Sequence, residues 1–100
     1  AFASNLLVSP ADFRWLKGEE LVGKFELEEA KHFATAFCKK CGSSMPWLAQ
    51  TGSAVVVPAG TLDGNPEIKP FQNVFCASRA IWYTSPSKLA EYDELPPRKK

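Results

Sequence analysis

Cys38 and Cys41 are the residues of this sequence whose type and spacing point most directly to chemistry. A C-x-x-C turn places two thiolates close together on a tight loop, as two corners of a tetrahedral zinc site require. Gly42 follows the second cysteine and permits a backbone bend that points peptide N–H groups at sulfur. Lys39 and Lys40 lie between the cysteines and partly offset the charge of a thiolate-rich site. The pair therefore predicts half of a structural zinc site.

Two other interpretations of the cysteine pair stay open. A thioredoxin-like redox pair normally opens a helix within a βαβ pattern, which this sequence does not show. The other interpretation is a pair of buried thiols with no role. A structural zinc site needs two further ligands, but we expect Cys76 to be a small buried hydrophobe and His32 to be a surface or strand-edge residue. We therefore expect the missing ligands to lie upstream of the given sequence.

The length of 100 residues, with 45% hydrophobic residues and a net charge of +1, fits one small globular domain. We assign residues 1–95 to this domain and residues 96–100 to a basic C-terminal tail. The sequence opens without an initiator methionine, and we expect the biological protein to extend further at its N-terminus. A domain of this size buries a modest core, so a metal ion would contribute a meaningful share of its stability.

The charge and hydropathy of the sequence argue against nucleic acid and membrane as partners. The basic residues cluster only at 98–100, which does not form a stripe for nucleic acid. No apolar run approaches the roughly 20 residues that span a bilayer, and no secretory signal is present. Three cysteines do not make the disulfide framework of a secreted protein. We expect a cytoplasmic protein that binds neither nucleic acid nor membrane.

Short strands separated by turns dominate the predicted secondary structure. We expect strands within residues 1–9, 13–16, 21–27, 31–37, 45–48, 54–57 and 71–77. Residues 21–27 would also suit a helical turn, and the segment after residue 77 could hold a short helix. The strongest predicted turn is Asp63-Gly64-Asn65-Pro66. Because strands and helices do not alternate, the sequence favours a mainly β protein over a parallel α/β sheet.

Three segments, in this order and spacing, resemble the glutathione-dependent formaldehyde-activating enzyme family, which also includes the centromere protein V domain. They are Phe37–Ser43 (FCKKCGS), Ala59–Asp63 (AGTLD) and Ser78–Trp82 (SRAIW). The resemblance covers essentially the whole chain, and the ordered set is more specific than C-x-x-C alone. It implies a β-tent of twisted antiparallel sheets with a zinc-binding knuckle and little helix.

In the family that this sequence resembles, an upstream C-x-C joins the downstream C-x-x-C to hold a structural zinc. A separate C-x-C-x-x-C offers three thiolates to a second, more open zinc, which is thought to be the reactive one. Only Cys38 and Cys41 carry over to this sequence, as metal ligands, because neither upstream motif occurs in it. The catalytic residues therefore remain unknown at this point.

Several other positions are assigned ordinary structural roles. We expect the tryptophans to be core or cleft-lining aromatics; they are Trp15, Trp47 and Trp82. Asp63 is expected to form a turn rather than act as an acid, and Arg79 to be an exposed strand cation. Asn73 stands where the family often has histidine, and Ile81 stands where proline often precedes the tryptophan. No role is carried over to these two positions.

The resemblance implies a zinc-dependent carbon–sulfur lyase similar to S-(hydroxymethyl)glutathione synthase. Its substrate would be the adduct between formaldehyde and a small thiol such as glutathione. An open zinc position could bind the thiolate or polarise the hydroxymethyl oxygen. The alternative is a non-catalytic binding module stapled by zinc, or an inactive fragment, because the ligands of the reactive zinc are absent from this sequence.

Overall fold

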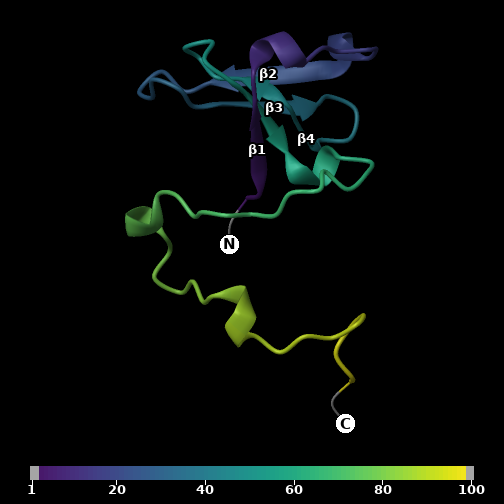
Figure 1. Ribbon diagram of the computed structural model, residues 1–100, viewed down its shortest axis with the longest axis vertical. Helices are drawn as coiled ribbons and strands as arrows, with labels where there is room; N and C mark the ends of the chain where they lie inside the picture. The colour runs from purple at the N-terminus through teal and green to yellow at the C-terminus, as the bar shows by residue number, and fades with distance from the viewer. Residues whose placement is uncertain (1–2, 99–100) are drawn as a thin grey trace. The chain divides into compact units, whose positions relative to one another are not determined.

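The computed structural model describes residues 3–98 of the chain. The chain divides into two units at residues 70 and 71, and all six strands of the described residues belong to the first unit (Figure 1). Residues 1–2 and 99–100 lie outside the described residues, and with them the start of the first expected strand and the end of the basic tail. The assignment of residues 1–95 to a domain and 96–100 to a tail stays a prediction.

The first antiparallel sheet has the strand order β1-β6-β5. Its strands are β1 (Asn5–Val8), β5 (Trp47–Leu48) and β6 (Val55–Pro58). Three consecutive valines of the central strand β6, Val55 to Val57, are buried. Because successive side chains of a strand point to opposite faces, both faces of β6 are covered. The valine run thus forms the strand that its β-branched residues predict.

The second antiparallel sheet has the strand order β2-β3-β4. Its strands are β2 (Val22–Glu26), β3 (Ala34–Cys38) and β4 (Ser44–Met45). In the central strand β3, Ala34 and Ala36 are buried, and these alternate residues lie on one face. Val22 pairs with Cys38 at one end of the β2–β3 ladder. The ladder therefore ends at the first cysteine.

Pro46 lies between β4 and β5 and separates the two sheets along the chain. Proline has no backbone N–H and cannot continue a central ladder. The chain consequently leaves the second sheet at Met45 and enters the first sheet at Trp47. The single strand expected for residues 45–48 is therefore wrong, because its two halves belong to different sheets.

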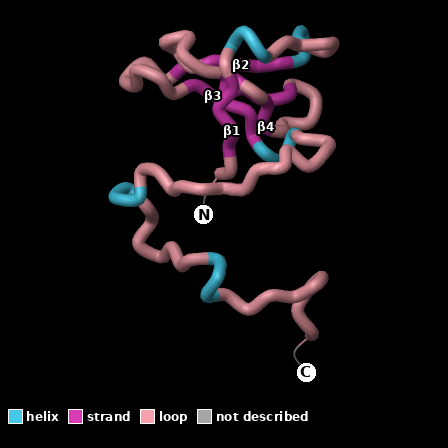
Figure 2. The backbone as a smooth tube through the Cα atoms, viewed as in Figure 1, coloured by secondary structure: helices cyan, strands magenta, loops and turns pink. Residues whose placement is uncertain are grey.

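The helical segments of residues 3–98 are all 3-10 turns of three residues, coloured cyan in Figure 2. They are η1 (Pro10–Asp12), η2 (Glu19–Leu21), η3 (Ala59–Thr61), η4 (Cys76–Ser78) and η5 (Pro86–Lys88). None of them has the length or hydropathy that a bilayer-spanning helix needs. With two antiparallel sheets and no α-helix in the described residues, the expected mainly β class is confirmed.

Two expected strands do not form. Residues 13–16 have no ladder partner, although Phe13 and Trp15 contact each other edge to face with ring centroids 5.4 Å apart. Residues 71–77 also pair with no strand, and Phe75 adopts a left-handed φ of 55° before the η4 turn. An apolar run becomes a strand only where a second strand satisfies its backbone groups. Both expectations are therefore wrong.

The core of the described residues is small. Its buried hydrophobic side chains come from alanine and valine only; they are Ala34, Ala36, Ala49, Val55, Val56 and Val57. Each of these side chains removes little apolar surface from water, so the hydrophobic contribution to stability is correspondingly modest. Additional anchoring of the loops by hydrogen bonds or by a metal ion would therefore matter in this protein.

Candidate metal-binding turn and adjoining cleft

The two cysteines lie on the turn that joins β3 to β4. The backbone N–H of Cys38 donates to the carbonyl of Ser43 at 2.9 Å, and the N–H of Gly42 donates to the carbonyl of Cys38 at 2.7 Å. Gly42 has a φ of +80°, in the left-handed region where a side chain is disfavoured. Lys39 N–H donates to the Leu21 carbonyl at 2.8 Å and ties the turn to the start of β2. The backbone therefore closes the turn without help from the cysteine side chains.

Cys38 is half-buried and Cys41 is exposed. The Cys41 thiol donates a hydrogen bond to Oγ of Ser43 over 3.3 Å. Hydrogen bonds from the Ser43 hydroxyl, from the Ser43 backbone N–H and from the Cys38 side chain stabilise the thiolate and hold the pKa of Cys41 below its ordinary value. The thiolate is the form that binds metals, so the turn favours the metal-binding form of Cys41.

The chemistry of this donor set fits part of a zinc site. Two cysteines on one turn are the usual unit from which tetrahedral zinc sites are built. Among residues 3–98, however, no three or more histidine, cysteine, aspartate or glutamate side chains gather closely enough to hold a metal ion. The described residues thus supply a pair of ligands rather than a full set, and the assignment of Cys38 and Cys41 to zinc stays a prediction.

His32 lies at the opposite end of β3 from the cysteines. It precedes the strand, and its Nδ1 atom is 3.1 Å from Oγ1 of Thr51 on the loop between β5 and β6. Cys38 follows His32 by six positions, which is roughly 20 Å of extended chain. His32 is exposed, as expected for a surface histidine, and the structure does not bring it to the cysteine turn.

The other singled-out residues, from Asp63 to Trp82, are exposed. Cys76 begins the η4 turn, so its expected place as a buried hydrophobe in a strand is wrong. Trp82 is 71% exposed and does not pack in a core. Arg79 is exposed, but it follows the η4 turn rather than lying on a strand. Asp63 is exposed at the predicted turn, where Asn65 Oδ1 accepts a hydrogen bond from the N–H of Glu67 at 2.8 Å.

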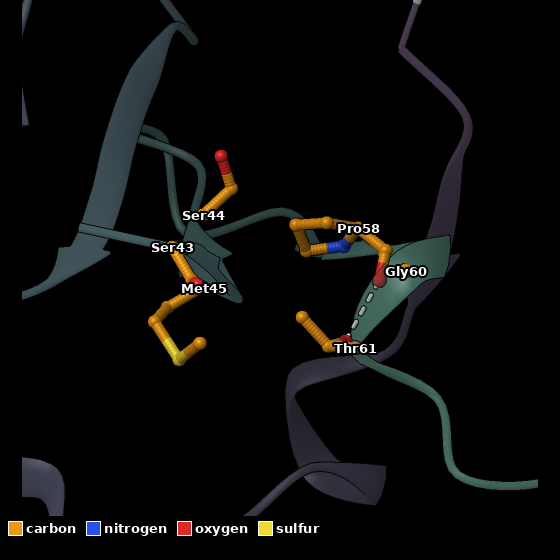
Figure 3. Close-up of a pocket in the computed structure, with 6 residues that line it drawn as sticks. All are labelled: Ser43, Ser44, Met45, Pro58, Gly60 and Thr61. Carbon is orange, nitrogen blue, oxygen red and sulfur yellow. Dashed lines mark hydrogen bonds between the residues drawn. The ribbon is translucent and has the colours of Figure 1, made fainter. Parts of the chain in front are cut away.

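A hollow of about 410 Å³ lies beside the cysteine turn. Figure 3 shows Ser43, Ser44 and Met45 on one side of it, facing the segment from Pro58 to Thr61 on the other. The hydroxyl of Thr61 donates to the Pro58 carbonyl at 2.7 Å, which fixes the η3 turn at the end of β6. The hollow is therefore bounded by one strand from each sheet.

A second hollow of about 420 Å³ continues from the first. It shares four lining residues with it, namely Ser44, Met45, Pro58 and Gly60. It extends to Phe33 and Trp47, whose rings meet edge to face at 5.7 Å between centroids. We call the two hollows together the inter-sheet cleft. The sequence predicted a core or cleft role for Trp47. It did not indicate that Ser43, Ser44 and Met45 line a cleft, and the only signal for these residues was the Gly-Ser-Ser run after Cys41.

The fold and the site define a class of small antiparallel β proteins with a paired-cysteine turn beside a cleft. Residues 1–78 match the family model described as glutathione-dependent formaldehyde-activating enzyme, and the chain belongs to this family. The matched residues include both sheets, the cysteine turn and every residue of the inter-sheet cleft. No curated protein and no solved structure gave a significant match. The resemblance seen in the three sequence segments is thereby confirmed.

Proposed function

We propose that this protein acts as a zinc-dependent carbon–sulfur lyase on the adduct between formaldehyde and glutathione, or another small thiol. The observation that carries the proposal is the C-x-x-C turn, with its paired thiols, in a chain that belongs to the glutathione-dependent formaldehyde-activating family. We also place the protein in the cytoplasm, where a reducing environment keeps such thiols available.

In the proposed synthetic direction, the thiolate sulfur of the substrate attacks the carbon of formaldehyde. A carbon–sulfur bond forms, and the proton released by the thiol ends on the former carbonyl oxygen, giving a hydroxymethyl thioether. Zinc, when bound, supplies Lewis-acid activation. Cys38 and Cys41 would hold an ion that fixes the β3–β4 turn beside the cleft, and the family pattern assigns the remaining ligands to cysteine motifs upstream of these residues.

A second candidate function is a non-catalytic binding module stapled by zinc. It is favoured by the ligand count, because the described residues bring together two thiols and not the three ligands of an open catalytic site. In that case the metal at Cys38 and Cys41 would contribute to folding, and the cleft would bind without chemistry.

Metal analysis tests the site. We expect the Cys38→Ser and Cys41→Ser variants to lose bound zinc, because each removes one of the paired ligands. The Cys76→Ser variant is the matched control and should keep the zinc content of the unaltered protein, since Cys76 lies on a different turn. Zinc retained by both turn variants would overturn the assignment.

An activity measurement separates the two candidate functions. The zinc-loaded protein is mixed with glutathione and formaldehyde, and hydroxymethyl adduct formation is followed by NMR against the uncatalysed reaction. Acceleration that is lost in Cys38→Ser but kept in Cys76→Ser supports the lyase. Zinc binding without acceleration contradicts the lyase and leaves the zinc-stapled module.

A further inference from the structure

Strand β1 (labelled in Figure 1) lies at one edge of the first sheet, because the strand order is β1-β6-β5 and β1 pairs with β6 alone. Asn5 stands opposite Pro58, which has no N–H to donate. The next bond of the ladder runs from the N–H of Ala59 to the carbonyl of Ser4, at 2.8 Å. Asn5 and Pro58 are therefore a pair that exchanges no hydrogen bonds with each other.

Hydrogen-bonded and non-hydrogen-bonded pairs alternate along an antiparallel ladder. Leu6 and Val8 consequently direct their N–H and C=O groups toward β6, whereas Asn5 and Leu7 direct theirs away from it. Within residues 3–98, neither Asn5 nor Leu7 makes a backbone hydrogen bond outside the β1–β6 ladder. The side chain of Leu7 is also 74% exposed. An edge with unpaired backbone groups is a template for a further strand.

The other three sheet edges of the described residues are protected in ways that β1 is not. Strand β2 carries Lys24 and Glu26, whose charged groups lie 3.9 Å apart. Strands β4 and β5 have two residues each and flank Pro46. Charged side chains, short strands and proline are the usual means of preventing edge pairing. Strand β1 has four residues, none of them charged and none of them proline.

We infer that β1 is a self-association surface, and that it pairs antiparallel with β1 of a second copy of this chain across a twofold axis at Leu6. The N–H of Leu7 then donates to the carbonyl of Asn5 of the second copy, and the N–H of Asn5 donates to the carbonyl of Leu7 of the second copy. The twofold axis repeats both bonds, so four hydrogen bonds join the copies. The two sheets become one sheet of six strands. This inference does not depend on the proposed function.

The side chains of β1 favour a second copy as its partner. Leu6 meets its own counterpart in a non-hydrogen-bonded pair, where side chains approach most closely. Leu7 lies opposite Asn5 of the second copy and diagonal to the other Leu7. Because β1 is uncharged, the twofold axis brings no like charges together. A twofold axis at Leu7 would instead require Ser9, which lies beyond the strand and whose carbonyl already accepts from the N–H of Asp12 at 2.9 Å.

Sedimentation of the zinc-loaded full chain over a concentration series tests the association, with a reductant present to exclude disulfide links. The contact is small, so we expect a reversible dimer whose share rises with protein concentration. Hydrogen exchange followed by NMR locates the contact. The amides of Asn5 and Leu7 should exchange more slowly at high concentration, whereas the amide of Leu6 should be protected at every concentration because it bonds to β6. A monomer throughout, or association without slower exchange at Asn5 and Leu7, would overturn the inference.

Two substitutions of Leu7 separate backbone pairing from contact between apolar side chains. Leu7→Pro removes the outward N–H, which an edge strand tolerates, and leaves the bonds to β6 in place. By symmetry it removes two of the four bonds between the copies, so the dissociation constant of the dimer should rise about tenfold or more. Leu7→Thr keeps the N–H and a strand-favouring side chain, and should weaken the dimer much less.

A dispersed NMR spectrum verifies that both Leu7 variants are folded. Equal weakening by the two variants would show that backbone pairing at β1 does not hold the dimer, and the inference would be wrong. The exchange rates of the Asn5 and Leu7 amides are measured in the unaltered protein, so they test the inference even where Leu7→Pro fails to fold. A dimer with slowed exchange at both amides supports it whether or not the protein accelerates adduct formation.

Discussion

The two ends of strand β3 are both anchored by hydrogen bonds, but they use different groups. At the end that begins with Ala34, the side-chain amide of Gln50 donates to backbone carbonyls of the loop between β2 and β3. These carbonyls belong to Leu27, Ala30 and Phe33, at 2.8, 3.2 and 2.5 Å. The Gln50 backbone N–H also donates to the His32 carbonyl at 3.1 Å. We call this group of contacts the Gln50 clasp.

At the other end of β3, the backbone of the turn closes on itself through Cys38, Gly42 and Ser43. The thiol of Cys41 takes part only in contacts with Ser43 and Cys38 in the described residues. An amide nitrogen has two protons, and three carbonyls share those of Gln50, so the clasp has no donor left for a ligand. The comparison suggests that one end of β3 is closed for stability, whereas the other leaves its sulfur atoms available.

Replacing the hydrogen-bond donor of Gln50 by an acceptor gives the largest expected change in the free energy of unfolding. Gln50→Glu replaces the donor by a carboxylate that faces carbonyl oxygens, and we expect the free energy of unfolding to fall by about 3 kcal/mol at pH 8. The loss should be smaller at pH 4, because a protonated acid can donate one hydrogen bond. Urea denaturation at both pH values measures the change.

The matched control for this prediction is Gln72→Glu, since Gln72 is exposed and its side chain donates no hydrogen bond to a backbone carbonyl within the described residues. This control should change the free energy of unfolding only slightly. Folded Gln50→Glu should still bind zinc at the cysteine turn, because β3 separates the two ends. Equal effects of the two substitutions would mean that the clasp does not stabilise the loop.

A substitution at Gly23, near the cysteine end of β3, gives the next largest expected change in the free energy of unfolding. Gly23 pairs with Phe37, and a Cβ atom at residue 23 would lie 2.5 Å from Cζ of the phenylalanine ring. The ring is 41% exposed and can move outward, so Gly23→Ala should lower the free energy of unfolding by about 1–2 kcal/mol. Because Phe37 precedes Cys38, zinc affinity at the turn should fall as well.

A second substitution reveals the cause of the Gly23→Ala effect. Phe37→Leu removes the ring, so the double variant should lose less stability than the sum of the two single variants, as measured by denaturation. Gly64→Ala is the control, since a Cβ there meets no atom within 4 Å and the φ is not left-handed. Strict additivity of the two substitutions would show that contact with the ring is not responsible.

The parts of the fold that depend on local sequence could be predicted. The buried valines of β6 and the turn at Cys38 to Gly42 follow from residue types within a few positions of one another. The expected strand at residues 71–77 failed although its composition is suitable, because pairing depends on a distant partner. Pro46 was visible in the sequence, but the assignment of its two neighbours to different sheets was not.

The candidate site shows the same division between local and distant information. Cys38 and Cys41 could be named from their spacing, and their proximity to Ser43 follows from the turn. The inter-sheet cleft joins residues near 33, 45 and 60, which meet only after both sheets have formed. The three carbonyls around Gln50 are backbone groups and leave no signature in residue types. Hydrophobic periodicity therefore could not reveal either feature.

The smallest expected effect is a shift in the pKa of the Cys41 thiol, at the cysteine end of β3. Ser43→Ala removes the hydroxyl that contributes most to lowering the pKa of Cys41, so that pKa should rise toward its ordinary value. Since the thiolate is the nucleophile, the midpoint of the pH profile for iodoacetamide alkylation should move to higher pH in the reduced, metal-free protein. Mass spectrometry assigns the alkylated residue. The control is Ser53→Ala, on the loop between β5 and β6, which should leave the midpoint unchanged. An unchanged midpoint in Ser43→Ala would show that the Ser43 hydroxyl does not stabilise the thiolate. The backbone N–H of Ser43 and the Cys38 side chain would then be the stabilising groups.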